Sequence, residues 1–164
     1  MGRVTKSSTC FLVAIILAGC SEPEANNNTV ACNENSFRKV DSVYTYYDNG
    51  KLKNLTLYWL GKKEKVVMEY DSAGILFRED RYLGDTMQIM KMFYPSGKLW
   101  WDVPYINDKT NGVQKKYYES GSLEMEVLYK DAVPVGVERW YYENGKVKTE
   151  FFYTKGKITR RKDY

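Results

Sequence analysis

The chain has 164 residues, of which 25 are Lys or Arg and 21 are Asp or Glu, and it contains no histidine. The lack of histidine removes the commonest general base and the commonest metal ligand. The sequence also lacks a Cys-x-x-Cys pair, a Gly-rich phosphate loop and a Gly-x-Ser-x-Gly elbow. We therefore expect no enzymatic activity, no cofactor and no metal site.

The N-terminal stretch has the order of a secretory signal. Arg3 and Lys6 form a positive region, and the apolar run from Cys10 to Ala18 is shorter than the roughly 20 residues that cross a membrane. Leu17-Ala18-Gly19-Cys20 resembles the lipobox of bacterial lipoproteins, which implies cleavage before Cys20 and acylation of Cys20. We predict a lipoprotein signal peptide over residues 1–19 and a membrane anchor at Cys20.

Residues 20–36 are polar and rich in asparagine, so they are predicted to be a flexible tether behind the acylated cysteine. Ser21 is not the aspartate that resembles an inner-membrane retention signal, and this resemblance favours the outer membrane within the cell envelope. Cys32 has no intramolecular partner once Cys20 is acylated, so a free thiol or an intermolecular disulfide is expected. Removing Arg3 and Lys6 leaves 23 basic against 21 acidic residues, a net charge of +2, which does not support a nucleic-acid partner.

Residues 37–164 are predicted to form one domain built from a repeated phrase. Its clearest copy is Tyr142-Glu143-Asn144-Gly145-Lys146-Val147. Two sets of tyrosines recur at intervals of 23 or 24 residues, a spacing that marks a repeat architecture. The sets are Tyr47, Tyr70, Tyr94, Tyr118 and Tyr142, and Tyr58, Tyr82, Tyr105, Tyr129 and Tyr153.

The Asn144-Gly145 pair suits a two-residue type I′ turn, in which both residues have positive φ. Each repeat is therefore predicted to be a β-hairpin. Counting outward from the turn places Tyr141 opposite Lys148, and it brings opposite charges together in three hairpins. These pairs are Lys91 with Asp102, Lys115 with Glu126, and Arg139 with Glu150.

The second repeat departs from this pattern, because Ala73 adds a residue to its loop and Val67 falls opposite Glu79. We expect that hairpin to be irregular. Segments 106–112 and 130–136 have the composition of turns at the opposite edge. The whole domain is predicted to be all-β, an elongated antiparallel meander of about ten strands in five stacked hairpins.

Alternation of side chains along each strand predicts two different faces. The better buried one is expected to carry Tyr94, Leu99, Met92, Trp101, Tyr118, Leu123, Met125, Tyr142, Val147 and Trp140. The other is expected to carry charged residues and a column of aromatic residues. The column positions are Tyr46, Glu69, Phe93, Tyr117 and Tyr141, with Lys53, Phe77, Trp100, Glu124 and Lys148 across the hairpins.

The aromatic column is the predicted partner-binding surface, because exposed rings bordered by charges supply contact area at low entropic cost. Its candidate binding residues are Tyr46, Phe93, Trp100, Tyr117, Tyr141 and Lys148. The other interpretation is that these rings stabilise the sheet by packing on each other. The basic cluster Arg160-Arg161-Lys162 is expected to be a solvated, frayed end, and contact with anionic headgroups is its alternative.

The whole period resembles the MORN-type repeat in its bacterial variant, in which units read Tyr-Tyr-x-Asn-Gly-Lys-Leu with a tyrosine six residues later. The resemblance covers residues 43 to 156 and implies a stack of hairpins without catalytic residues. It also implies a non-enzymatic, membrane-anchored protein that binds a protein partner, and the family includes antitoxin or immunity proteins that neutralise a toxin. The alternative is a structural envelope protein that binds lipid headgroups or glycan.

Overall fold

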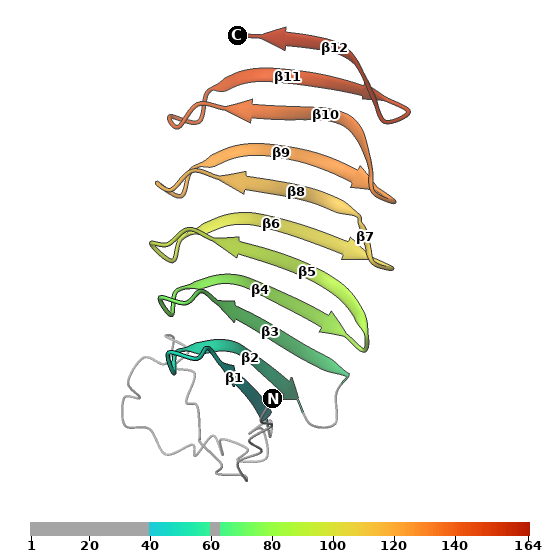
Figure 1. Cartoon of the computed structure of the whole chain (residues 1–164). Coiled ribbons are helices and arrows are strands. Elements are labelled where there is room, and N and C mark those ends of the chain that lie inside the picture. Colours follow the sequence, from blue (N-terminus) through green and yellow to red (C-terminus); the bar gives the residue numbers. More distant parts are fainter. Residues whose placement is uncertain (1–39, 60–62) are drawn as a thin grey trace, which may run out of the picture. The chain divides into compact units, whose positions relative to one another are not determined.

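The computed structural model describes residues 40–59 and 63–164, and these form one antiparallel sheet whose strands follow chain order (Figure 1). The strands are β1 (Val40–Tyr46), β2 (Leu52–Trp59), β3 (Glu64–Tyr70), β4 (Leu76–Leu83), β5 (Thr86–Phe93), β6 (Leu99–Ile106), β7 (Lys109–Thr110), β8 (Gly112–Tyr117), β9 (Leu123–Lys130), β10 (Val133–Tyr141), β11 (Val147–Thr154) and β12 (Lys157–Asp163). The predicted all-β meander of stacked hairpins is confirmed. It has 12 strands rather than about ten, because the short β7 precedes β8 and β12 follows the fifth hairpin.

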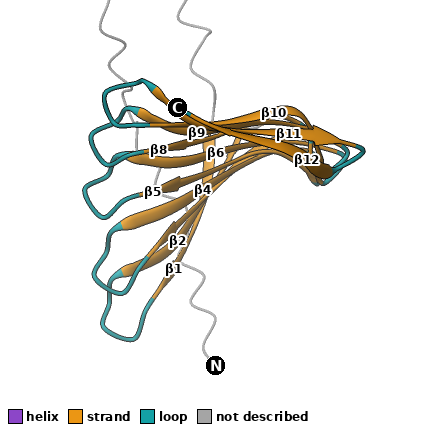
Figure 2. Cartoon of the chain, turned by 90° about the horizontal axis from the view of Figure 1, so that it is seen from above, coloured by secondary structure: helices purple, strands orange, loops and turns teal. Residues whose placement is uncertain are grey.

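Within this sheet the strands change direction steadily from β1 to β12, as the right-handed twist of strands requires (Figure 2). No helix among the described residues is long and apolar enough to cross a membrane. The predicted signal peptide, Cys20 and the tether lie outside the described residues and stay predictions.

Five turns, which we call the tyrosine turns, join β1–β2, β3–β4, β5–β6, β8–β9 and β10–β11 (Figure 1). They are not the predicted type I′ turns. In the fifth, the Gly145 amide donates to the Tyr142 carbonyl (2.8 Å) and the Tyr142 amide donates to the Lys146 carbonyl (2.8 Å). Only Gly145 has a positive φ there (80°), so the loop has three residues and is followed by a bulge. Asn144 instead accepts the Lys146 amide on its side chain (3.0 Å).

The type I′ geometry occurs at the other ends of the strands, in turns where two neighbouring residues both have positive φ. These pairs are Asn107-Asp108, Asp131-Ala132 and Lys155-Gly156. The first two lie in the segments that the sequence marks as turns. Asparagine and aspartate tolerate this left-handed conformation better than other residues, but Ala132 and Lys155 adopt it because the strands on either side impose it.

The second hairpin is regular, contrary to expectation. Its loop runs from Asp71 to Ile75 with the same pair of backbone hydrogen bonds as the other four tyrosine turns. Asp71 therefore stands where the other loops have tyrosine, and Ala73 is not an extra residue. Tyr70 moves into the aromatic column in place of Glu69, and Glu79 faces Met68 rather than Val67.

The loop tyrosines connect one hairpin to the next. The Tyr118 hydroxyl donates to the Tyr141 carbonyl (2.7 Å), 23 residues along the chain. Tyr94 bonds in the same way to Tyr117, and Tyr47 to Tyr70 (both 2.8 Å). Because Asp71 replaces the tyrosine, no such bond joins the second and third hairpins within the described residues.

Replacing Tyr118 with Phe should lower the free energy of unfolding by about 1 kcal/mol, the net value of one hydrogen bond. The measurement is chemical denaturation of the full chain. Tyr142→Phe is the matched control, since the Tyr142 hydroxyl makes no hydrogen bond within residues 40–59 and 63–164. Equal destabilisation by the two substitutions would contradict a role for the interhairpin bond.

Each bulge changes which face of the sheet a residue occupies. Tyr141 lies opposite Val147, while Trp140 lies opposite Thr149, so Lys148 is the extra residue between them. The extra residues of the five hairpins are Lys53, Phe77, Trp100, Glu124 and Lys148. The aromatic column faces aliphatic residues in every hairpin, in the pairs Tyr46–Leu52, Tyr70–Leu76, Phe93–Leu99, Tyr117–Leu123 and Tyr141–Val147.

This arrangement corrects the predicted faces. Met92, Trp101, Met125 and Trp140 do share one face, which we call the tryptophan face. Leu99, Leu123 and Val147 belong with the aromatic column on the other face, because one bulge residue shifts the alternation. Most of the buried residues lie on the tryptophan face; they are Asp80, Val103, Met125, Val127 and Thr149.

The opposite face carries one charge per strand, alternating in sign across eight neighbouring strands. This charge row consists of Glu79, Lys91, Asp102, Lys115, Glu126, Arg139, Glu150 and Lys162. The three predicted pairs are part of it, and the contacts between hairpins join them into one row. The predicted frayed end is wrong, because Arg160, Arg161 and Lys162 lie in β12 and pair with β11.

Lys115→Glu should destabilise the sheet, because the new carboxylate would face Asp102 on one side and Glu126 on the other. We expect a loss of about 0.5–2 kcal/mol from the two cross-strand contacts, and the loss should shrink in high salt. Denaturation at low and high ionic strength measures it. Lys98→Glu, in an exposed turn, is the control; an equal loss there would mean that net charge, not the row, is responsible.

Candidate binding site on the tryptophan face

A lysine lies between two tryptophans near the middle of the tryptophan face. The Lys116 ammonium is 5.7 Å from the Trp101 ring centre and 5.6 Å from that of Trp140. Trp101 and Lys116 are direct cross-strand partners, and Met125 separates Lys116 from Trp140. Glu124 turns toward the same face as a bulge residue and pairs with the ammonium at 2.9 Å. The charge is thus balanced within the site and is stabilised by both rings.

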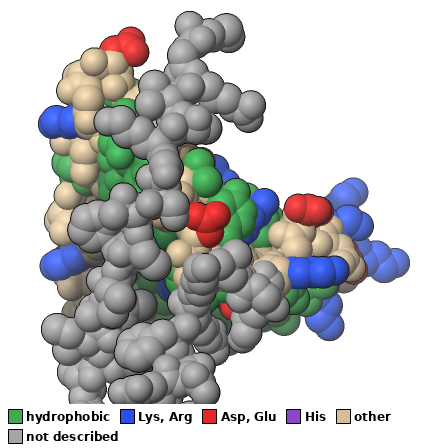
Figure 3. Space-filling model, turned by 90° about the horizontal axis from the view of Figure 1, so that it is seen from below, with side chains coloured by type: hydrophobic (Ala, Val, Ile, Leu, Met, Phe, Trp, Pro, Cys, Tyr) green, Lys and Arg blue, Asp and Glu red, His purple; other side chains and the backbone are tan. Residues whose placement is uncertain are grey.

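Two further rings extend this cluster toward the third tyrosine turn. Trp100 packs edge to face against Trp101, with ring centres 6.2 Å apart, and it lies 5.6 Å from Tyr94. The predicted binding residue Trp100 therefore belongs to the tryptophan face because it is a bulge residue. Figure 3 shows the molecule from below, where hydrophobic and charged side chains both reach the visible surface.

Beyond Trp140 the same face forms an open hollow of about 370 Å³. Its lining residues are Glu138, Trp140, Lys148, Thr149, Phe151, Tyr153, Ile158 and Arg161. Glu138 lies on one wall, where it accepts hydrogen bonds from the Trp140 indole and from the Tyr153 hydroxyl (2.7 Å). The two donors fix the orientation of their rings, so the hollow has preformed aromatic walls.

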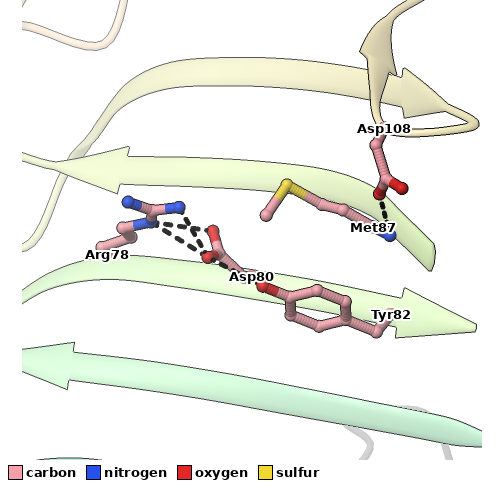
Figure 4. Close-up of polar contacts among 5 residues, drawn as sticks. All are labelled: Arg78, Asp80, Tyr82, Met87 and Asp108. Carbon is pink, nitrogen blue, oxygen red and sulfur yellow. Dashed lines mark hydrogen bonds and ion pairs between the residues drawn. The ribbon is translucent and has the colours of Figure 1, made fainter. Parts of the chain in front are cut away.

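A buried ion pair lies on the same face toward the N-terminal hairpins (Figure 4). Asp80 is only 3% exposed, and Arg78 donates to both of its carboxylate oxygens, each at 3.0 Å from Nε. The hydrogen bond to Asp80 raises the pKa of the Arg78 guanidinium, so the guanidinium stays charged. The Tyr82 hydroxyl lies 3.5 Å from Asp80. Because these groups satisfy one another, the cluster stabilises the sheet and leaves Asp80 unavailable to a ligand.

The column residues of the predicted site lie on the opposite face. Tyr46 is 60% exposed, whereas Phe93, Tyr117 and Tyr141 are partly buried against their aliphatic partners. Lys148 is exposed and lies beside the hollow. The structure thus separates the six predicted binding residues into four on the column and two on the tryptophan face. Their role in partner binding stays a prediction.

The residues that sequence reasoning missed are Lys116, Arg78 and Asp80. The position of a lysine between two tryptophans cannot be predicted from the sequence, because Trp101, Lys116 and Trp140 come from three different strands. The period alone could have flagged Asp80, since it precedes Tyr82 by two residues and its counterparts two residues before the later tyrosines are Val103, Val127 and Phe151.

Two tyrosines on these surfaces have strongly raised pKa values. Burial and a 2.7 Å hydrogen bond to Glu126 raise the pKa of Tyr141 to about 12. Burial and the bond to Glu138 raise the pKa of Tyr153 to about 12 as well. Both hydroxyls therefore remain donors throughout the neutral range.

Stability should consequently fall in strong alkali. Unfolded tyrosines ionise near pH 10, so above that pH the unfolded state releases protons that folded Tyr141 and Tyr153 keep until about pH 12. The free energy of unfolding must decrease as the pH rises through this interval. An ultraviolet absorbance titration should show a late tyrosine step in the folded chain that Tyr141→Phe reduces and urea abolishes. A folded chain without a late step would contradict the assignment.

Among residues 40–59 and 63–164 no group of three or more acidic or cysteine side chains is placed to hold a metal ion. The fold and this site define an open, single-layer β-repeat protein with two different solvent-facing sides.

The sequence comparison identifies the repeat. Residues 42–59, 110–131 and 134–155 match the family model of the MORN repeat variant, and these segments coincide with the first, fourth and fifth hairpins. Three of the five hairpins therefore match the MORN repeat variant. No curated protein matches the sequence.

Two solved structures resemble part of the chain. The crystal structure of TarM has a TM-score of 0.41 and 10% identity, covering 56% of this chain and 21% of that one. A mutant of S. aureus TarM in complex with fondaparinux, α-GlcNAc-glycerol and UDP has a TM-score of 0.43 and 8% identity, covering 57% of this chain and 21% of that one. This chain thus spans about a fifth of those proteins, and at these scores the likeness carries no information on function.

Proposed function

We propose that the chain is a lipid-anchored protein of the cell envelope that binds a protein partner through the tryptophan face of its repeat sheet and catalyses no reaction. The row Trp101–Lys116–Trp140, which opens into the aromatic hollow, is the observation that carries this proposal. Tryptophan, tyrosine and cations in preformed surroundings are typical of the few residues that dominate binding energy in protein interfaces.

The openness of the sheet supports the proposal. Within the described residues no second layer covers either face, and only Val66, Val103, Met125 and Val127 are buried apolar residues. Most aromatic side chains on the tryptophan face are therefore still partly exposed to water. A partner that covered them would gain about 25 cal/mol for each Å² of apolar surface removed from water.

The anchor and the outer-membrane location rest on the sequence around Cys20. An acylated N-terminus would restrict the domain to one membrane surface and raise its effective concentration for a partner there. The finer proposal is that the partner is a toxin which this protein neutralises, and its support is the resemblance of the repeats to antitoxin and immunity proteins.

The test is capture of the partner by the tagged full chain from detergent extracts of its own cells, with three chains compared. Trp140→Ala removes one wall of the hollow, and Lys115→Ala is the matched control on the opposite face. We expect one protein to be retained by the unaltered chain and the control and reduced about tenfold by Trp140→Ala, as for an interface hot spot.

Capture that survives Trp140→Ala, or that Lys115→Ala abolishes, would contradict the assignment of the face. If no protein is retained, the partner proposal fails, and binding to lipid headgroups or glycan becomes the function to examine. The toxin version requires in addition that the captured protein arrest growth when expressed alone and that co-expression of this chain restore growth.

A further inference from the structure

The last strand, β12, has an outer edge that no other described strand covers. Every residue of the strand is exposed. It carries Lys157, Arg160, Arg161 and Lys162 against a single acid, Asp163, so its net charge is +3 (four cations minus one anion). An open strand edge with a strong charge can either repel other strands or select one of opposite charge.

The positions of the cations distinguish these roles. The Arg160 guanidinium lies 3.6 Å from the centre of the Phe152 ring, and that of Arg161 lies 5.6 Å from the Phe151 ring. Both rings belong to β11, so these side chains lie back over the sheet rather than across the open edge. Lys162 lies 3.9 Å from the Tyr164 ring. The backbone of the outer edge therefore stays accessible, with positive charge held beside it.

The charge row specifies what an added strand should carry. Cation and anion alternate across neighbouring strands from Glu79 to Lys162, and Lys162 is the last member. A strand added beyond β12 would continue the row if it placed a carboxylate opposite Lys162. Opposite charges directly across a strand pair are favourable, and like charges there are unfavourable.

This chemistry argues against a second copy of the chain. Two β12 edges paired antiparallel would oppose a net charge of +3 to another of +3. The other edge of the described sheet is β1, which places Tyr44 at the level of the row and carries only Asp41 as an acid. Lys162 already faces Glu150 on β11, and neither edge of another copy offers a second carboxylate to face it across the outer edge.

We propose that β12 binds an extended acidic segment of a partner protein as an added antiparallel strand, with a carboxylate opposite Lys162. This inference rests on the proposed function, since it names the chemistry of the partner. Backbone hydrogen bonds would supply affinity, and the cations would select the sequence. Ile158 and Arg161 line the hollow, so the added strand would lie beside the tryptophan face.

The probe is a fluorescent synthetic peptide with the sequence of β9 (Leu123–Lys130). That strand already pairs with β8, which runs in the same direction as β12, and it places Glu126 opposite Lys115. Binding to the full chain is measured by fluorescence anisotropy, and protection of β12 amides by hydrogen exchange. One control peptide carries Glu124→Lys and Glu126→Lys, and a second is N-methylated at alternate residues so that its charges remain but its ladder cannot form.

The unmodified peptide should bind and protect β12, and both control peptides should bind about tenfold more weakly. Lys162→Glu in the chain should weaken binding by a similar factor. Lys146→Glu, an exposed lysine in the fifth tyrosine turn, should leave binding unchanged.

Equal binding of the N-methylated peptide would overturn the proposal in favour of simple charge attraction, and insensitivity to Lys162→Glu would overturn the location. Failure of the acidic peptide, while capture of a partner still depends on Trp140, would reject the added strand and leave the proposed function standing. Peptide binding without capture of any protein would reject the proposed function instead. Dimerisation of the full chain that Lys162→Glu abolishes would identify the occupant as a second copy and reject an acidic partner.

Discussion

The rest of the sheet depends on a tyrosine turn and a one-residue register shift beside it, a combination that all five hairpins share. In the fifth turn Gly145 has a φ of 80°, a conformation that a side chain strains, and a bulge lies just beyond the loop, between Val147 and Thr149. Because of the bulge, Lys148 lies on the tryptophan face and Val147 lies beside the aromatic column. Because all five hairpins repeat this step, both faces of the domain take their composition from one backbone feature.

The sequence predicts the fold and the distant register well for a physical reason. The predicted hairpin has a two-residue loop without a bulge, whereas the structure has a three-residue loop followed by one extra residue. Both arrangements place Arg139 opposite Glu150. The predicted pairs of Lys91 with Asp102 and of Lys115 with Glu126 are correct for the same reason. Only the positions next to the turn are wrong, and they hold Trp100 and Lys148 of the predicted site. Asn-Gly pairs favour type I′ turns, but here the asparagine serves as a side-chain acceptor for Lys146.

The sequence could not predict the contacts between neighbouring hairpins. These contacts depend on the turns that connect one hairpin to the next and on the register shift in strands such as β10. The alignment of Asp102 with Lys115 and of Glu126 with Arg139 comes from that register, and it joins separate pairs into the charge row. The position of Lys116 between Trp101 and Trp140 has the same origin. Asp71 occupies the position that a tyrosine has in the other four loops. The sequence does not reveal this, because Tyr70 lies one residue earlier and fits the tyrosine spacing.

The forces that hold this sheet together act mainly between neighbouring strands, as in other repeat proteins. The tyrosine–carbonyl hydrogen bonds, the aromatic–aliphatic pairs and the charge row all act in this way. Within residues 40–59 and 63–164 no second layer covers either face. The two faces differ in the free energy that it would cost to remove their charged groups from water. Burial of the charge row would remove eight ionised groups from water at high cost. On the tryptophan face the Lys116 charge is already paired with Glu124, and Trp140, Phe151 and Tyr153 line the neighbouring hollow. A partner that docked on the tryptophan face would therefore cover these rings while Lys116 kept its ion pair, whereas a partner on the other face would have to cover the whole charge row.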